Sequence, residues 1–129
     1  MRVTINYQPD KPTVNNHIYP RSVVENMMGV RVPVTFGVDS EYSISIKDII
    51  GYCTLSLEGE DIIGDVELLK DKNIKVLQFC DWSTKCLADL NNNVIQDGCK
   101  LLSVFATLSP HIGDNVDVKH LPDQLFEVD

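Results

Sequence analysis

The sequence predicts an α+β fold made mainly of β-strands, in a single domain that spans residues 1–129. Three observations predict it: short runs alternate apolar and polar residues, glycine, proline and asparagine separate these runs, and one segment has helical spacing. A chain of 129 residues buries roughly two-thirds of the surface that its unfolded form exposes. We therefore expect one hydrophobic core that needs no disulfide.

The N-terminal half contains the clearest local signals. Residues 2–7 alternate and predict a first strand, which a proline- and asparagine-rich loop follows. A helix is expected to begin near Pro20, because proline suits the first helical turn, and to end at Gly29. Residues 30–36 alternate but contain a proline, which is typical of an edge strand. Residues 50–69 form two alternating runs around Glu58-Gly59-Glu60-Asp61, the pattern of a β-hairpin.

In the C-terminal half the pattern changes several times. Residues 74–78 fit either a helix or a short strand, and the spacing of Leu87 and Leu90 favours a helix over 84–90. Asparagine at 91–93 and the run 96–98 predict turns. Residues 100–108 are strongly apolar and predict a central strand. Short terminal strands are expected at 116–118 and 125–128.

The charge of the chain limits its partners. Eleven basic and nineteen acidic residues give a net charge of −8, and the Lys and Arg residues do not cluster as binding to a phosphate backbone requires. No apolar run approaches the roughly 20 residues of a membrane span, and no apolar signal region follows Arg2. We therefore expect a protein partner or self-association, with no nucleic acid and no membrane. A basic protein surface would be electrostatically acceptable as a partner.

Two residue sets resemble metal or disulfide sites. The cysteines at 53, 80, 86 and 99 contain no Cys-x-x-Cys pair, so we expect reduced, structural thiols. A second set recurs at a three-residue step and consists of His111, Asp114, Asp117 and His120. On a strand, odd and even positions point to opposite faces, so these four would not converge there, whereas a loop could gather three of them. We favour a solvated loop and expect no metal and no cofactor.

Ser103 is the candidate nucleophile. It lies inside the apolar run Leu101-Leu102-Ser103-Val104-Phe105. A serine there is either a small buried residue or a nucleophile, and a nucleophile needs an adjacent base. No base can be placed from the residues alone, which favours the buried interpretation.

Four segments, taken in chain order, resemble the prohead (capsid maturation) serine proteases of tailed phages. They are Asn15-Asn16-His17-Ile18-Tyr19-Pro20 with Val23 and Val24, the hairpin from Ile50 to Leu69, the apolar strand around Ser103, and Leu121 to Val128, which ends Leu125-Phe126-Glu127-Val128. The resemblance implies a protease-like domain: a small antiparallel β-barrel or strongly curved sheet with one to three short helices. It also implies that Ser103 occupies the position of the family nucleophile.

The sequence departs from that family at the catalytic histidine. In the family, this histidine follows a glycine and an aspartate. The corresponding stretch here is Phe36-Gly37-Val38-Asp39-Ser40-Glu41, so that Ser40 stands where the histidine belongs. Without an imidazole, nothing takes the proton of the Ser103 hydroxyl.

The expected function is therefore that of a non-catalytic phage or prophage protein. It would act through protein–protein contacts in capsid assembly or decoration, in the cytoplasm of the infected bacterial cell or in the virion. One alternative is an active prohead-type serine peptidase that uses Ser103 with a displaced base, such as His17, His111 or His120. Another is an unrelated β-rich binding module.

Overall fold

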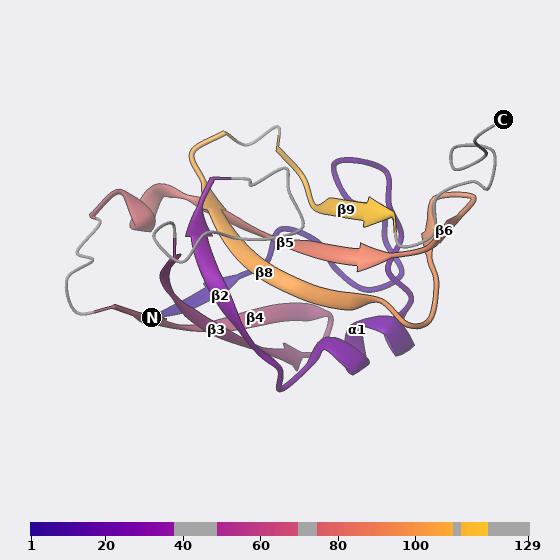
Figure 1. Cartoon of the computed structure of the whole chain (residues 1–129), viewed down its shortest axis with the longest axis horizontal. Coiled ribbons are helices and arrows are strands. Elements are labelled where there is room, and N and C mark those ends of the chain that lie inside the picture. The colour runs from indigo at the N-terminus through magenta and orange to yellow at the C-terminus, as the bar shows by residue number, and fades with distance from the viewer. Residues whose placement is uncertain (38–48, 70–74, 110–111, 119–129) are drawn as a thin grey trace, which may run out of the picture.

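A computed structural model describes residues 1–37, 49–69, 75–109 and 112–118 of the chain. Its main feature is one curved seven-stranded sheet with the order β1-β4-β3-β2-β8-β5-β9 (Figure 1). The strands of this sheet are β1 (Arg2–Thr4), β2 (Arg31–Phe36), β3 (Ile49–Glu58), β4 (Asp61–Leu68), β5 (Asp81–Ala88), β8 (Lys100–Thr107) and β9 (Asn115–Val118). The other elements are the helix α1 (Arg21–Met27), a 3-10 helix (Lys75–Phe79) and the small ladder of β6 (Leu90–Asn91) with β7 (Val94–Ile95).

The sheet is mixed, so the expectation of an antiparallel sheet is wrong at two places. β2 pairs with β8, and β5 with β9, in parallel. These pairs join strands that other elements separate along the chain, and short-range sequence patterns do not report such pairings. The mainly β, α+β class is confirmed.

The sheet does not close into a barrel, because β1 and β9 are its two ends. It does curl far enough for the chain after β1 to reach β5. Ile5 forms a parallel bridge with Trp82, and the N–H of Asn6 donates to the carbonyl oxygen of Trp82 at 2.8 Å. The expected curved sheet is therefore present, and the closed barrel is not confirmed.

Local signals placed the helix and the hairpin correctly. α1 buries Val23, Val24 and Met27 and is followed by Gly29, whose φ of 76° is accessible to glycine without strain. β3 and β4 pair up to Glu58 and Asp61, which leaves a two-residue loop in which Gly59 has a φ of 62°. A positive φ at the first loop position is typical of the type II′ hairpin turn.

Two other assignments are wrong. β2 is not an edge strand, because it lies between β3 and β8. Pro33 is tolerated there because the ladder to β8 begins only at Val34. Residues 84–90 are not helical, since β5 continues to Ala88 with β8 on one side and β9 on the other. Strand pairing on both sides overrides the helical spacing of two leucines.

The core lies on the concave side of the sheet and also buries α1. β8 is central, as predicted, and contributes Leu101, Val104 and Ala106 to this core. From β5 the core receives Trp82, Cys86 and Ala88, so the even-numbered residues of that strand face inward. Within the described residues, no helix has the length and apolar character needed to cross a membrane.

Candidate functional sites

Ser103 is buried, and a lysine lies directly opposite it. On β8 the serine is 1% exposed and pairs with Lys85 of β5, which is also 1% exposed. Directly opposed residues of an antiparallel pair share one face of the sheet. Since Cys86 faces the core, Lys85 and Ser103 belong to the other face. Nζ of Lys85 lies 3.8 Å from Oδ2 of Asp117 on β9.

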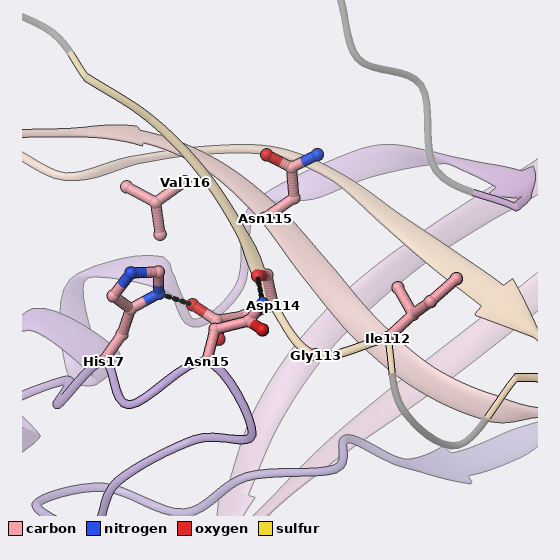
Figure 2. A pocket seen from close by; sticks show the side chains of 7 residues that line it. All are labelled: Asn15, His17, Ile112, Gly113, Asp114, Asn115 and Val116. Carbon is pink, nitrogen blue, oxygen red and sulfur yellow. Dashed lines mark hydrogen bonds and ion pairs between the residues drawn. The ribbon is translucent and has the colours of Figure 1, made fainter.

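A second cluster of polar residues surrounds the carboxylate of Asp114 (Figure 2). This side chain is fully buried, and its Oδ2 lies 2.8 Å from Nδ1 of His17. The hydroxyl of Tyr19 donates to the same oxygen at 2.6 Å. The side-chain amide of Asn15 donates to the backbone oxygen of Asp114, also at 2.6 Å. These contacts fasten the loop before α1 to the residue that precedes β9.

The cluster continues into the core through two stacked tyrosine rings. Tyr7 and Tyr19 stack with ring centroids 4.5 Å apart, and the Tyr7 hydroxyl lies 2.6 Å from Oγ1 of Thr84 on β5. Burial raises the pKa of both tyrosines well above the ordinary value, so both hydroxyls stay protonated at neutral pH. Thr84 is adjacent to Lys85 on the strand, and the two residues point to opposite faces of the sheet.

The structure gives no support for His17 as the displaced base, because its ring nitrogen Nδ1 is held by Asp114. The network of His17 reaches β5 on the core face at Thr84, whereas Ser103 lies opposite Lys85 on the other face. Of the other two candidate bases, His111 and His120 both lie outside the described residues, and so does Ser40.

The His17–Asp114 pair has the form of the base half of a hydrolase triad. A buried carboxylate holds one ring nitrogen, and Figure 2 shows the second ring nitrogen pointing away from Asp114. The pair borders a pocket of about 270 Å³. The described residues that line it are Asn15, His17, Ile112, Gly113, Asp114, Asn115 and Val116. None of these side chains carries a hydroxyl or thiol nucleophile, so we interpret the pair as a structural clamp.

Only two of the four candidate metal ligands, Asp114 and Asp117, are among the described residues. Asp114 is bound by His17 and Tyr19, while Asp117 lies beside Lys85. His111 and His120 are not among the described residues. No three His, Cys, Asp or Glu side chains gather into a metal site within residues 1–37, 49–69, 75–109 and 112–118.

All four cysteines are described and are free thiols, as expected from their spacing. Cys53 and Cys86 are buried, and Cys80 and Cys99 are half-buried. Burial raises the pKa of Cys53 to about 12, and the nearby Asp65 adds to this effect. Such thiols act as small apolar side chains at neutral pH.

Three exposed apolar residues lie near the point where β2 and β8 end and β5 begins. Phe36 is the last residue of β2, and its partner Ala106 lies two positions before Leu108, so Phe36 and Leu108 are diagonal neighbours. Phe79 ends the 3-10 helix just before β5, which pairs with the same end of β8. The exposed fractions are 45% for Phe36, 56% for Leu108 and 74% for Phe79. We call these three residues the apolar end.

Comparisons with models of protein families, with curated proteins and with solved structures found no match to this chain. The resemblance to prohead proteases therefore rests on the four sequence segments, of which Leu121 to Val128 lies outside the described residues. The His17–Asp114 pair was not predicted from sequence. Its members are 97 positions apart, and no local spacing links them.

Proposed function

We propose that the chain is a non-enzymatic protein-binding module of a phage or prophage that acts in capsid assembly or decoration. The capsid role follows from the sequence resemblance, and it places the chain in the infected bacterial cytoplasm or on the virion. The observation that carries the binding function is the apolar end. Phe79, Phe36 and Leu108 are each exposed near the same end of the sheet, and aromatic and aliphatic side chains of this kind anchor protein interfaces.

The net charge indicates the chemistry of the partner. At −8, the chain attracts a protein surface with basic residues around an apolar centre. Such a partner would cover the apolar end, and its basic residues would complement the net negative charge of the chain. Basic residues at its rim would accelerate association more than they would tighten the complex.

Site-specific photo-crosslinking in cells that carry the gene tests this proposal. A benzoylphenylalanine at position 79 should crosslink one discrete protein, and Phe36→Ser with Leu108→Ser should abolish the crosslink. The matched control carries the same probe at Val14, which is 56% exposed and lies on the loop before α1. Equal crosslinking from positions 79 and 14 would contradict the proposal.

The peptidase alternative is supported by one observation, the position of Lys85 across from Ser103. Lysine replaces histidine as the base in some serine hydrolases. Against it, both side chains are 1% exposed, which leaves no room for a substrate carbonyl at the hydroxyl. A fluorophosphonate probe should leave the wild-type protein unlabelled. Labelling that Ser103→Ala and Lys85→Met both abolish would establish the peptidase instead.

A further inference from the structure

The free edge of β1 offers backbone hydrogen-bonding groups to a further strand. In an antiparallel ladder, hydrogen-bonded and non-hydrogen-bonded pairs alternate. Met1 and Val66 exchange two hydrogen bonds of 2.8 and 2.7 Å, and the N–H of Ile5 donates to Ile62 at 2.9 Å. These two pairs fix the alternation along β1.

Between Met1 and Ile5, the residue whose backbone groups bond to β4 is therefore Val3, which pairs with Gly64. The backbone groups of Arg2 and Thr4 form no hydrogen bonds with β4. The N–H and C=O groups of Arg2 and Thr4 point to the opposite side of the strand. The next group on that side is the N–H of Asn6, which donates to Trp82 on β5. Among the described residues, β1 forms a ladder with β4 alone, and its parallel bridge to β5 uses the carbonyl of Thr4. The outward groups that remain for a further strand are the N–H of Thr4 and the N–H and C=O of Arg2.

A slot begins where β1 and β5 separate. The two chains meet at the bridge between Ile5 and Trp82, and on the N-terminal side of that bridge the residues before β5 form the 3-10 helix instead of a strand (Figure 1). The space between them has a volume of about 370 Å³. Its walls are Met1, Arg2, Val3 and Thr4 on one side and Leu77, Gln78, Cys80 and Trp82 on the other. We call this space the β1 slot.

We infer that the β1 slot binds an extended segment of a partner protein, which adds to the free edge of β1 as one more strand. This inference rests on the proposed protein-binding function and names its mode of recognition. Strand addition supplies affinity through main-chain hydrogen bonds and specificity through alternate side chains. Because the slot is walled on both sides, it admits a single strand. The β1 of a second copy would bring its own β4 with it, and a slot for a single strand does not admit that pair.

The walls also determine the sequence that fits. Val3, Leu77 and Trp82 belong to the core, so the residue of the added strand that lies opposite Val3 points inward and must be apolar. The flanking residues point outward beside Arg2 and Thr4. Among the described residues that line the slot, Arg2 is the one with a charged side chain. Although Arg2 also contacts Glu58, its charge favours an acidic residue in the partner at the adjacent position. The slot also adjoins Phe79, so one partner can occupy both surfaces.

Selection from a displayed library of random nonapeptides on the full chain tests the inference. Selected peptides should share an acidic residue next to an apolar one, in an extended pattern. Thr4→Pro removes the outward N–H without removing a bond to β4, and edge strands tolerate proline. It should weaken peptide binding about tenfold. The matched variant Thr4→Val keeps both the N–H and the β-branched shape, and it should bind like the wild type.

A second test reverses the charge of the side chain at position 2. Arg2→Glu should shift the selected peptides from acidic to basic at the position beside residue 2. Peptides that bind Thr4→Pro as tightly as Thr4→Val, or a library without any enriched peptide, would overturn the inference. Oligomers that form with Thr4→Val but not with Thr4→Pro would assign the slot to a second copy and also overturn it. If the peptide results overturn this inference, crosslinking from position 79 in the wild type would show that the proposed function still stands.

Discussion

Nδ1 of His17 and Oδ2 of Asp114 lie 2.8 Å apart, although 97 positions separate the two residues in the chain. The carboxylate is buried and shared with the hydroxyl of Tyr19, so the loop before α1 and the start of β9 depend on one charged group. Removing one partner of a buried carboxylate leaves its charge incompletely compensated. The network should therefore contribute to stability, and its members can be tested separately.

The stacked tyrosines provide a matched pair for that test. Tyr19→Phe removes a hydrogen bond to a charged oxygen, whereas Tyr7→Phe removes one to the neutral hydroxyl of Thr84. We expect Tyr19→Phe to lower the free energy of unfolding by about 2 kcal/mol and Tyr7→Phe by about 1 kcal/mol. Urea denaturation followed by tryptophan fluorescence measures both values. Equal losses would show that the Asp114 carboxylate does not strengthen the bond of Tyr19.

A second prediction concerns the close approach of β3 and β4 at Gly51. A Cβ at this position would lie 2.4 Å from the backbone oxygen of Glu67, which cannot withdraw without disturbing the ladder. Gly51→Ala should therefore lower the free energy of unfolding by about 3 kcal/mol. In Gly59→Ala the added Cβ meets open space. The positive φ alone should therefore lower the free energy of unfolding, by about 1 kcal/mol. A larger loss in Gly59→Ala, measured by urea denaturation, would contradict this order.

The features that sequence predicted are those that neighbouring residues determine. α1 begins after Pro20 and ends before Gly29, and the hairpin turns at Gly59, because the backbone preferences of these residues act locally. The central position of β8 was also predictable, since a strand buried on both faces has a nearly continuous apolar sequence.

What sequence could not predict depends on contacts between distant segments. Two leucines favoured a helix over 84–90, but pairing with β8 and β9 determines a strand there. Pro33 indicated an edge, yet the register of β2 allows proline in a central strand. The candidate sites could not be predicted from sequence for the same reason. His17 and Asp114 carry no mutual spacing signal, and the placement of Lys85 opposite Ser103 depends on the register of β5 with β8.

A third prediction concerns the order in which the thiols react. Cys80 and Cys99 are half-buried, whereas Cys53 and Cys86 are buried. Burial also raises the pKa of Cys80, but the pKa is raised further at Cys53 and Cys86. A brief pulse of iodoacetamide at pH 8, followed by peptide mass analysis, should modify Cys80 and Cys99 at least about tenfold faster than the other two. In urea all four should react at similar rates. Rapid modification of Cys53 in the folded protein would contradict the burial of that thiol.

The last prediction is a loss of stability at alkaline pH. Burial raises the pKa of Cys53 from 9.0 to about 12, and burial likewise raises that of Tyr7 and Tyr19 above 10.0. Each group therefore holds its proton more tightly in the folded than in the unfolded chain. Their stabilising effect is complete below the unfolded pKa and is lost progressively as pH rises from the unfolded to the folded pKa, so the free energy of unfolding should fall from about pH 9 upward. One fully titrating group lowers it by at most about 1.4 kcal/mol per pH unit.

Urea midpoints between pH 7.5 and 11 measure this decline. Cys53→Val keeps an apolar side chain of similar size without the proton, so its decline between pH 9 and 10 should be shallower than that of the wild type. An identical decline in both proteins would show that Cys53 does not contribute to it.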